Sequence, residues 1–177
     1  MIKHSVFAVA ALGLFAAGAF AQQDEALQTR QTMVDEINPA ALAIWDVTNA
    51  AMNDEGGLDP ALISEDDWGK LAESGQALDT VGRRMAAART IVAAGPNLVA
   101  GAVPPGAASR EQIQAMIDAD PDGFRAVAVE MAKQGAALAA AAKARDAAAV
   151  GDLSTGLDGA CSSCHTRYWY LQEPPTG

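Results

Sequence analysis

Apolar residues recur at steps of three or four through most of the chain, the spacing that places them on one face of a helix. Pro39 falls inside the first such stretch, residues 24–52, and has no N–H to donate to the carbonyl of Asp35. We therefore expect a long first helix with a kink near Pro39. Its apolar stripe comprises Met33, Ile37, Ala40, Ile44, Val47 and Ala51.

Capping residues, glycines and prolines divide the rest of the chain into further helical stretches. Ser64 precedes three acids, a pattern that favours a helix start, and Gly95 with Pro96 favours its end. Asp120 and Pro121 supply a cap followed by proline at the first helical position. The predicted helices span residues 64–94, 109–119, 121–150 and 152–170. We therefore expect an all-α fold, an up-down antiparallel four-helix bundle with one short extra helix.

The first 21 residues have the pattern of a secretory signal. Lys3 precedes an uncharged apolar run over residues 5–23, and Ala19-Phe20-Ala21 matches an A-x-A cleavage site. A single membrane anchor is the alternative, because the run approaches the ~20 residues that span a bilayer. We expect cleavage after Ala21, which makes residues 1–21 a signal peptide and residues 22–177 one exported domain in the periplasm, with no membrane span after cleavage.

The chain is acidic, with a formal net charge of −10 and a pI near 4.5. Nucleic acids and anionic membranes are bound through basic surface, so neither is an expected partner. Complementary charge would instead suit a basic redox protein.

Cys161, Cys164 and His165 form a C-x-x-C-H motif, the pattern of c-type haem attachment. Two thiols three positions apart on a helical turn can each add to a vinyl group of one porphyrin, and the adjacent imidazole can then bind the iron. The motif predicts one covalently attached haem c. A structural disulfide, a thioredoxin-like redox site and a zinc site compete with this interpretation. The sequence favours them less, because the loop is tight, no βαβ pattern is present, and zinc needs about four ligands.

Any sixth iron ligand must lie upstream of the motif, because no methionine or histidine follows His165. His4 would leave with the signal, which excludes a second histidine in the mature domain. The candidates are Met33, Met52, Met85, Met116 and Met131, with lysine a remote alternative. Most methionines fill core space, and we expect that role for all of these except Met33, for which both roles stay open.

With these residues placed, the chain resembles the cytochrome c′ family and its low-spin, methionine-ligated relatives. The resemblance implies thioether bonds at Cys161 and Cys164 and His165 as the proximal ligand. It also implies haem packing by Tyr168, distal ligation by Met33, propionate binding by Arg30, and a homodimer. The sequence departs from the family at Trp169, where a basic residue is usual.

Three functions remain open at this point. The first is a non-enzymatic periplasmic carrier of single electrons between redox partners, with haem iron changing oxidation state. The second is a five-coordinate haem protein that binds nitric oxide or carbon monoxide for scavenging or sensing. The third is a helical zinc or thiol module without haem. No nucleophile–base constellation or phosphate loop indicates an enzyme.

Overall fold

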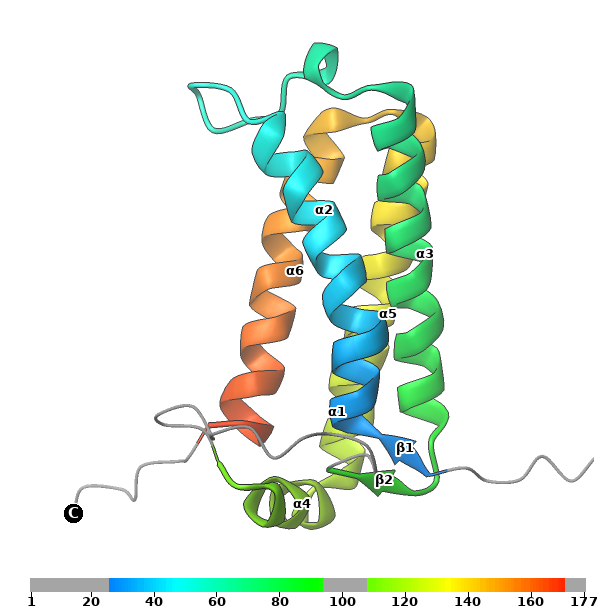
Figure 1. Cartoon of the computed structure of the whole chain (residues 1–177), viewed down its shortest axis with the longest axis vertical. Coiled ribbons are helices and arrows are strands. Elements are labelled where there is room, and N and C mark those ends of the chain that lie inside the picture. The colour runs from blue at the N-terminus through cyan, green and yellow to red at the C-terminus, as the bar shows by residue number, and fades with distance from the viewer. Residues whose placement is uncertain (1–25, 94–107, 171–177) are drawn as a thin grey trace, which may run out of the picture.

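The protein is a helical bundle in the computed structural model, which describes residues 26–93 and 108–170 (Figure 1). The predicted signal peptide, residues 1–21, lies outside the described residues. The long helices are α2 (Asn38–Ala50), α3 (Glu65–Ala87), α5 (Pro121–Ala144) and α6 (Ala147–Tyr168). The short α4 (Arg110–Ala119) crosses one end of the bundle. The all-α four-helix prediction, with its extra short helix, is confirmed.

The predicted caps are present at three helix starts. The Ser64 hydroxyl accepts a hydrogen bond from the Asp67 N–H at 3.2 Å, and Ser109 forms a full capping box with Gln112. Asp120 accepts from the Gly123 N–H at 3.0 Å at the start of α5. These contacts satisfy N–H groups that a helix leaves without internal partners.

Two helix ends differ from the prediction. The helix that starts after Ser64 ends at Ala87 and not near residue 94, and Ile91–Val92 forms strand β2. This strand pairs in parallel with β1 (Leu27–Gln28), so the chain ahead of the first helix is tied to the chain after α3. The helix α5 ends at Ala144 and not near residue 150, because Arg145 adopts a left-handed conformation with φ 56°.

The first helix is interrupted at the predicted place. A short α1 (Thr29–Thr32) leads into a π-helical turn, η1 (Met33–Ile37), which continues directly into α2. The expected irregularity near Pro39 is therefore present, but as a π turn and not as a simple kink.

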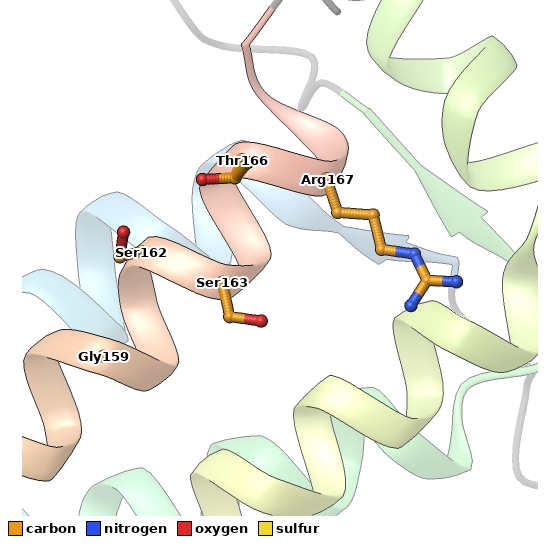
Figure 2. Close-up of a pocket in the computed structure, with 5 residues that line it drawn as sticks. All are labelled: Gly159, Ser162, Ser163, Thr166 and Arg167. Carbon is orange, nitrogen blue, oxygen red and sulfur yellow. The ribbon is translucent and has the colours of Figure 1, made fainter.

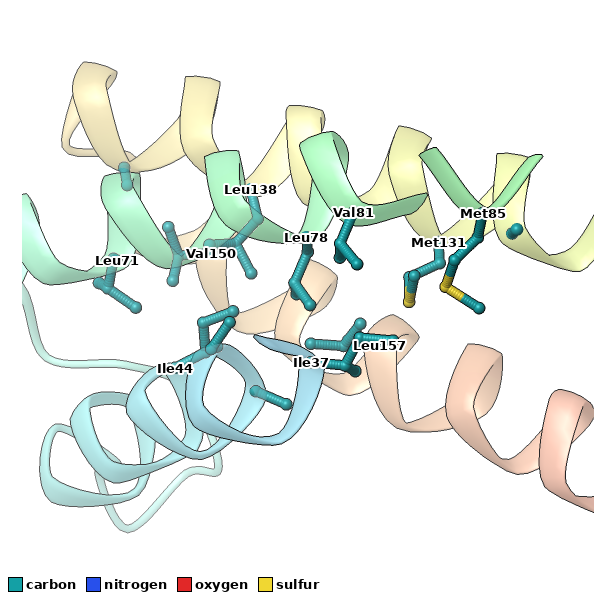
Figure 3. Close-up of a cluster of buried hydrophobic side chains, with 14 of the residues drawn as sticks. Ile37, Ile44, Leu71, Leu78, Val81, Met85, Met131, Leu138, Val150 and Leu157 are labelled. Carbon is teal, nitrogen blue, oxygen red and sulfur yellow. The ribbon is translucent and has the colours of Figure 1, made fainter. Parts of the chain in front are cut away.

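The core runs along the bundle axis and is built from side chains of all four long helices (Figure 3). The fully buried aliphatic side chains come from every one of these helices and include Ile44, Leu71, Leu78, Val81, Leu138, Val150 and Leu157. Helices α3 and α5 approach most closely, because glycines face backbone there. A Cβ on Gly75 would lie 2.7 Å from the Ala139 nitrogen, and one on Gly135 would lie 2.6 Å from the Gly75 oxygen. The first helix packs against α3 on one side and α6 on the other (Figure 1).

Candidate functional site

The cysteine–histidine motif lies in the last turns of α6. This helix starts at Asp146, whose carboxylate accepts a hydrogen bond from the Ala149 N–H at 3.0 Å. Its buried residues Val150, Ser154 and Leu157 recur at steps of three and four. At about 100° per residue, Cys161, Cys164 and His165 continue that inward face within an arc of about 100°. The motif therefore points into the bundle.

All three side chains of the motif are half-buried, and both cysteines are free thiols that pack against the core. Burial raises the pKa of Cys164 to about 11, and burial and then Asp158 raise the pKa of Cys161. Burial lowers the pKa of His165. The thiols are thus neutral at pH 7, and the imidazole is held toward the neutral form that can bind a metal ion.

A contact between helices shows which neighbour this face of α6 meets. The hydroxyls of Thr48 on α2 and Ser154 on α6 lie 3.3 Å apart in the interior. His165 follows Ser154 by eleven residues, close to three full helical turns, so it shares the face that is turned toward the first helix. His165 lies about 16 Å along α6 from this contact, and Met33 lies about 22 Å along the antiparallel first helix. The two residues are therefore at the same end of the bundle, about one turn apart in height.

Met33 and Arg30 occupy this end of the first helix. Met33 is half-buried and packs against the core, at the start of the π turn. Arg30 is exposed on α1. The end of α6 lies at the same end of the bundle as α1 (Figure 1).

The other methionines differ in their surroundings. Met85 and Met131 are buried, with 6% and 9% of their surface exposed, and lie together near Leu157 (Figure 3). Met116 is partly buried against the core. The core role expected for Met52 is wrong: it is 52% exposed and pairs with Leu58 in a β-bridge beyond the end of α2, at the other end of the bundle.

Tyr168 links the end of α6 to the start of α5. Its hydroxyl donates to the Asp120 carbonyl oxygen at 3.1 Å, and its ring meets Phe124 edge-on, with centroids 5.6 Å apart. Arg167 forms an ion pair with the same Asp120 carboxylate that caps α5. This junction fixes the helix segment that carries the motif. The capping of α5 by Asp120 was predictable from sequence, but its two partners on α6, 47 and 48 residues away, were not.

Two more aromatic rings flank His165. The centroid of Trp169 lies 5.8 Å from that of His165, and the centroid of Tyr170 lies 6.5 Å away. The basic residue usual at the position of Trp169 is therefore replaced by an indole beside the imidazole.

A shallow open hollow of about 750 Å³ lies on the opposite side of α6, over Gly159, Ser162, Ser163, Thr166 and Arg167 (Figure 2). These residues are roughly opposite the cysteines around the helix axis, and Arg167 reaches toward α5. We assign no haem-binding role to this hollow because both thiols face the other way.

The residues of the motif fit a covalently bound haem. Two reduced thiols at positions i and i+3 and a neighbouring imidazole make a donor set that suits vinyl addition and iron ligation. Across residues 26–93 and 108–170, no group of three or more His, Cys, Asp and Glu side chains is placed to hold a metal ion by itself.

Comparison with known proteins agrees with this interpretation of the motif. A family model for cytochrome c′ matches residues 68–169, more than half of the chain and all of the motif. The chain belongs to the cytochrome c′ family. No curated protein and no solved structure matches it. The family match begins after the first helix and does not include Met33 or Arg30.

Cytochrome c′ membership makes this a c-type haem protein with a helical-bundle fold. In the described residues, no helix has both the length and the apolar character needed to cross a bilayer.

Proposed function

We propose that the protein is a periplasmic carrier of single electrons with one haem c, held by Cys161, Cys164 and His165 and closed on the distal side by Met33. The observation that carries the proposal is the position of Met33, half-buried on the helix that packs beside α6, at the end of the bundle where α6 carries the motif. The cytochrome c′ family match supports the haem. Haem iron, when bound, supplies a one-electron couple whose potential depends on its axial ligands and burial.

The residues around the motif would each contribute to such a carrier. Cys161 and Cys164 would hold the porphyrin, and the partly buried, neutral His165 would bind the iron on one side. A thioether from Met33 would keep the iron six-coordinate in both oxidation states, so electron transfer would need little movement of the ligands. Arg30 is a candidate for pairing with a propionate, and Tyr168 for packing beside the porphyrin.

The acidic surface and the predicted signal bear on where the carrier works. A net charge of −10 would attract a basic redox partner from solution, and the attraction would weaken as salt is added. Cleavage of residues 1–21 would release residues 22–177 as a single domain in the periplasm. A homodimer stays a prediction of the family resemblance.

The proposal is tested by absorption spectra of the oxidised and reduced holoprotein, with and without carbon monoxide. We expect low-spin spectra that carbon monoxide leaves unchanged, because Met33 occupies the distal position. Met33→Leu removes the thioether at similar volume, and it should give a high-spin iron that binds carbon monoxide.

Two buried methionines provide matched controls. Met85→Leu and Met131→Leu change the same chemical group inside the core and should leave the low-spin spectrum intact. A low-spin spectrum that survives Met33→Leu would show that another residue closes the distal side. A high-spin wild type that binds carbon monoxide would favour the gas-binding function instead.

A further inference from the structure

The π turn at Met33–Ile37 changes which way the start of the first helix faces. The Asn38 N–H donates to the Met33 carbonyl, five residues back, and not to Val34, four residues back. The buried positions show the same five-residue spacing, because Thr32 and Ile37 are both buried. A π turn acts as one extra residue in the helix, so everything upstream is rotated by about 100°.

Pro39 gives a physical reason for the turn. In a regular α-helix its ring would crowd the Asp35 carbonyl, and that carbonyl would have no N–H donor four residues ahead. A five-residue step moves the Asp35 carbonyl away from the ring and brings the Ala40 N–H within its reach, and the carbonyl without a helical donor becomes that of Val34, five residues before Pro39. Pro39 itself is exposed, so it has no core-filling role that would compete with this one.

The rotation moves Met33 from one neighbouring helix to the other. Glu36 forms an ion pair with Arg84 at 2.5 Å and so marks the side of the first helix that faces α3. Thr48, through its contact with Ser154, marks the side that faces α6. In a regular helix Met33 would lie about 60° from Thr48 toward the α3 side. In the observed helix the π turn takes up one residue. Met33 therefore lies about 40° from Thr48 on the side away from α3, toward α6.

We propose that Pro39 is a positioning residue, which enforces the π turn at Met33–Ile37 and thereby turns the Met33 side chain toward α6 and His165. This inference rests on the proposed distal role of Met33. Pro39 would touch neither the haem nor its ligands and would act only through the backbone of the first helix.

The test has two steps. Pro39→Ala restores the missing N–H, and a second variant then also lacks one residue of the π turn. We expect the first helix of the Pro39→Ala variant to become regular, Met33 to rotate away from α6, and the iron to become high-spin and reactive to carbon monoxide. Deleting Val34 in the same variant leaves a regular helix with Met33 back on its original face, and should restore the low-spin spectrum. Asn38→Ala, at an exposed neighbour of Pro39, should change neither the turn nor the spectrum.

A second readout follows the backbone independently of the iron. In the reduced wild type, which is diamagnetic if the iron is low-spin, the through-hydrogen-bond coupling to the Met33 carbonyl carbon should come from the Asn38 nitrogen. In Pro39→Ala, recorded as the diamagnetic carbon monoxide complex of the reduced protein, it should come from the Ile37 nitrogen. A coupling that stays with Asn38 overturns the inference, and so does one that moves while the spectrum stays low-spin.

The two proposals can fail separately. If Met33→Leu leaves the spectrum low-spin, distal ligation by Met33 is wrong, and the coupling still decides whether Pro39 sets the turn. If Met33→Leu is high-spin but Pro39→Ala keeps the wild-type coupling, the distal ligand stands and the role of Pro39 is refuted.

Discussion

Asp120 shows how much of the site depends on one side chain. Its carboxylate caps α5 and pairs with Arg167, while its carbonyl accepts the Tyr168 hydroxyl. Sequence reasoning identified the cap because Asp-Pro is a local signal. It could not identify the partners on α6, because a contact across 47 or 48 residues depends on how the helices pack.

Removing the Tyr168 hydroxyl should weaken this junction. Tyr168→Phe keeps the buried ring and its contact with Phe124 but removes the donor to Asp120, which should lower the free energy of unfolding by about 1 kcal/mol. Urea unfolding of the holoprotein measures the change. Tyr170→Phe is the control, because Tyr170 is 48% exposed, and it should change stability by far less. Equal effects of the two substitutions would show that the Asp120 contact contributes nothing.

At the scale of elements, the sequence predicted helix ends well where a capping side chain marks them. It predicted them poorly where the end depends on backbone conformation or on contacts with distant residues. Ser64, Ser109 and Asp120 mark starts that the structure confirms. The end of α5 carries no glycine or proline: Arg145 takes the left-handed conformation and Asp146 caps the next helix at once. The two short strands depend on pairing between residues about 64 apart, so no local pattern reveals them.

The close approach of α3 and α5 predicts opposite effects for one substitution at two sites in α3. A Cβ on Gly75 would lie 2.7 Å from backbone nitrogen of α5, and neither helix can move away cheaply. Gly75→Ala should therefore destabilise the protein by about 1–3 kcal/mol in urea unfolding.

Gly69→Ala is the matched change in the same helix, where nothing lies within 4 Å of the added carbon. It should stabilise by about 0.5–1 kcal/mol, because alanine loses less backbone freedom than glycine on folding. If both variants were stabilised, the helices would not be as close as the structure has them.

For the whole molecule, several carboxylates make stability depend on pH. Hydrogen bonds lower the pKa of three carboxyl groups. Asp67 accepts from the Ser64 side chain, Glu111 accepts from its own backbone N–H, and Asp120 accepts from the Gly123 backbone N–H. A carboxyl group with a lower pKa in the folded state contributes stability above its unfolded pKa. It loses that contribution as pH falls through the folded value.

Stability in urea should therefore decline as pH falls below the ordinary values of 4.5 for glutamate and 3.8 for aspartate. Asp120→Asn cannot ionise, so its stability should be lower than that of the wild type at pH 7 and approach it near pH 3. Comparing the two proteins at each pH cancels effects that they share. A difference that is constant with pH would exclude a role for the charge of Asp120.

The central claim is that one haem is bound covalently through Cys161 and Cys164, and mass spectrometry under denaturing conditions tests it most directly. Protein exported by a host that matures c-type cytochromes should be heavier than its polypeptide by one haem. After proteolysis, the added mass should lie on the peptide that contains both cysteines. A peptide with two unmodified thiols, or with only a disulfide between them, would contradict the account.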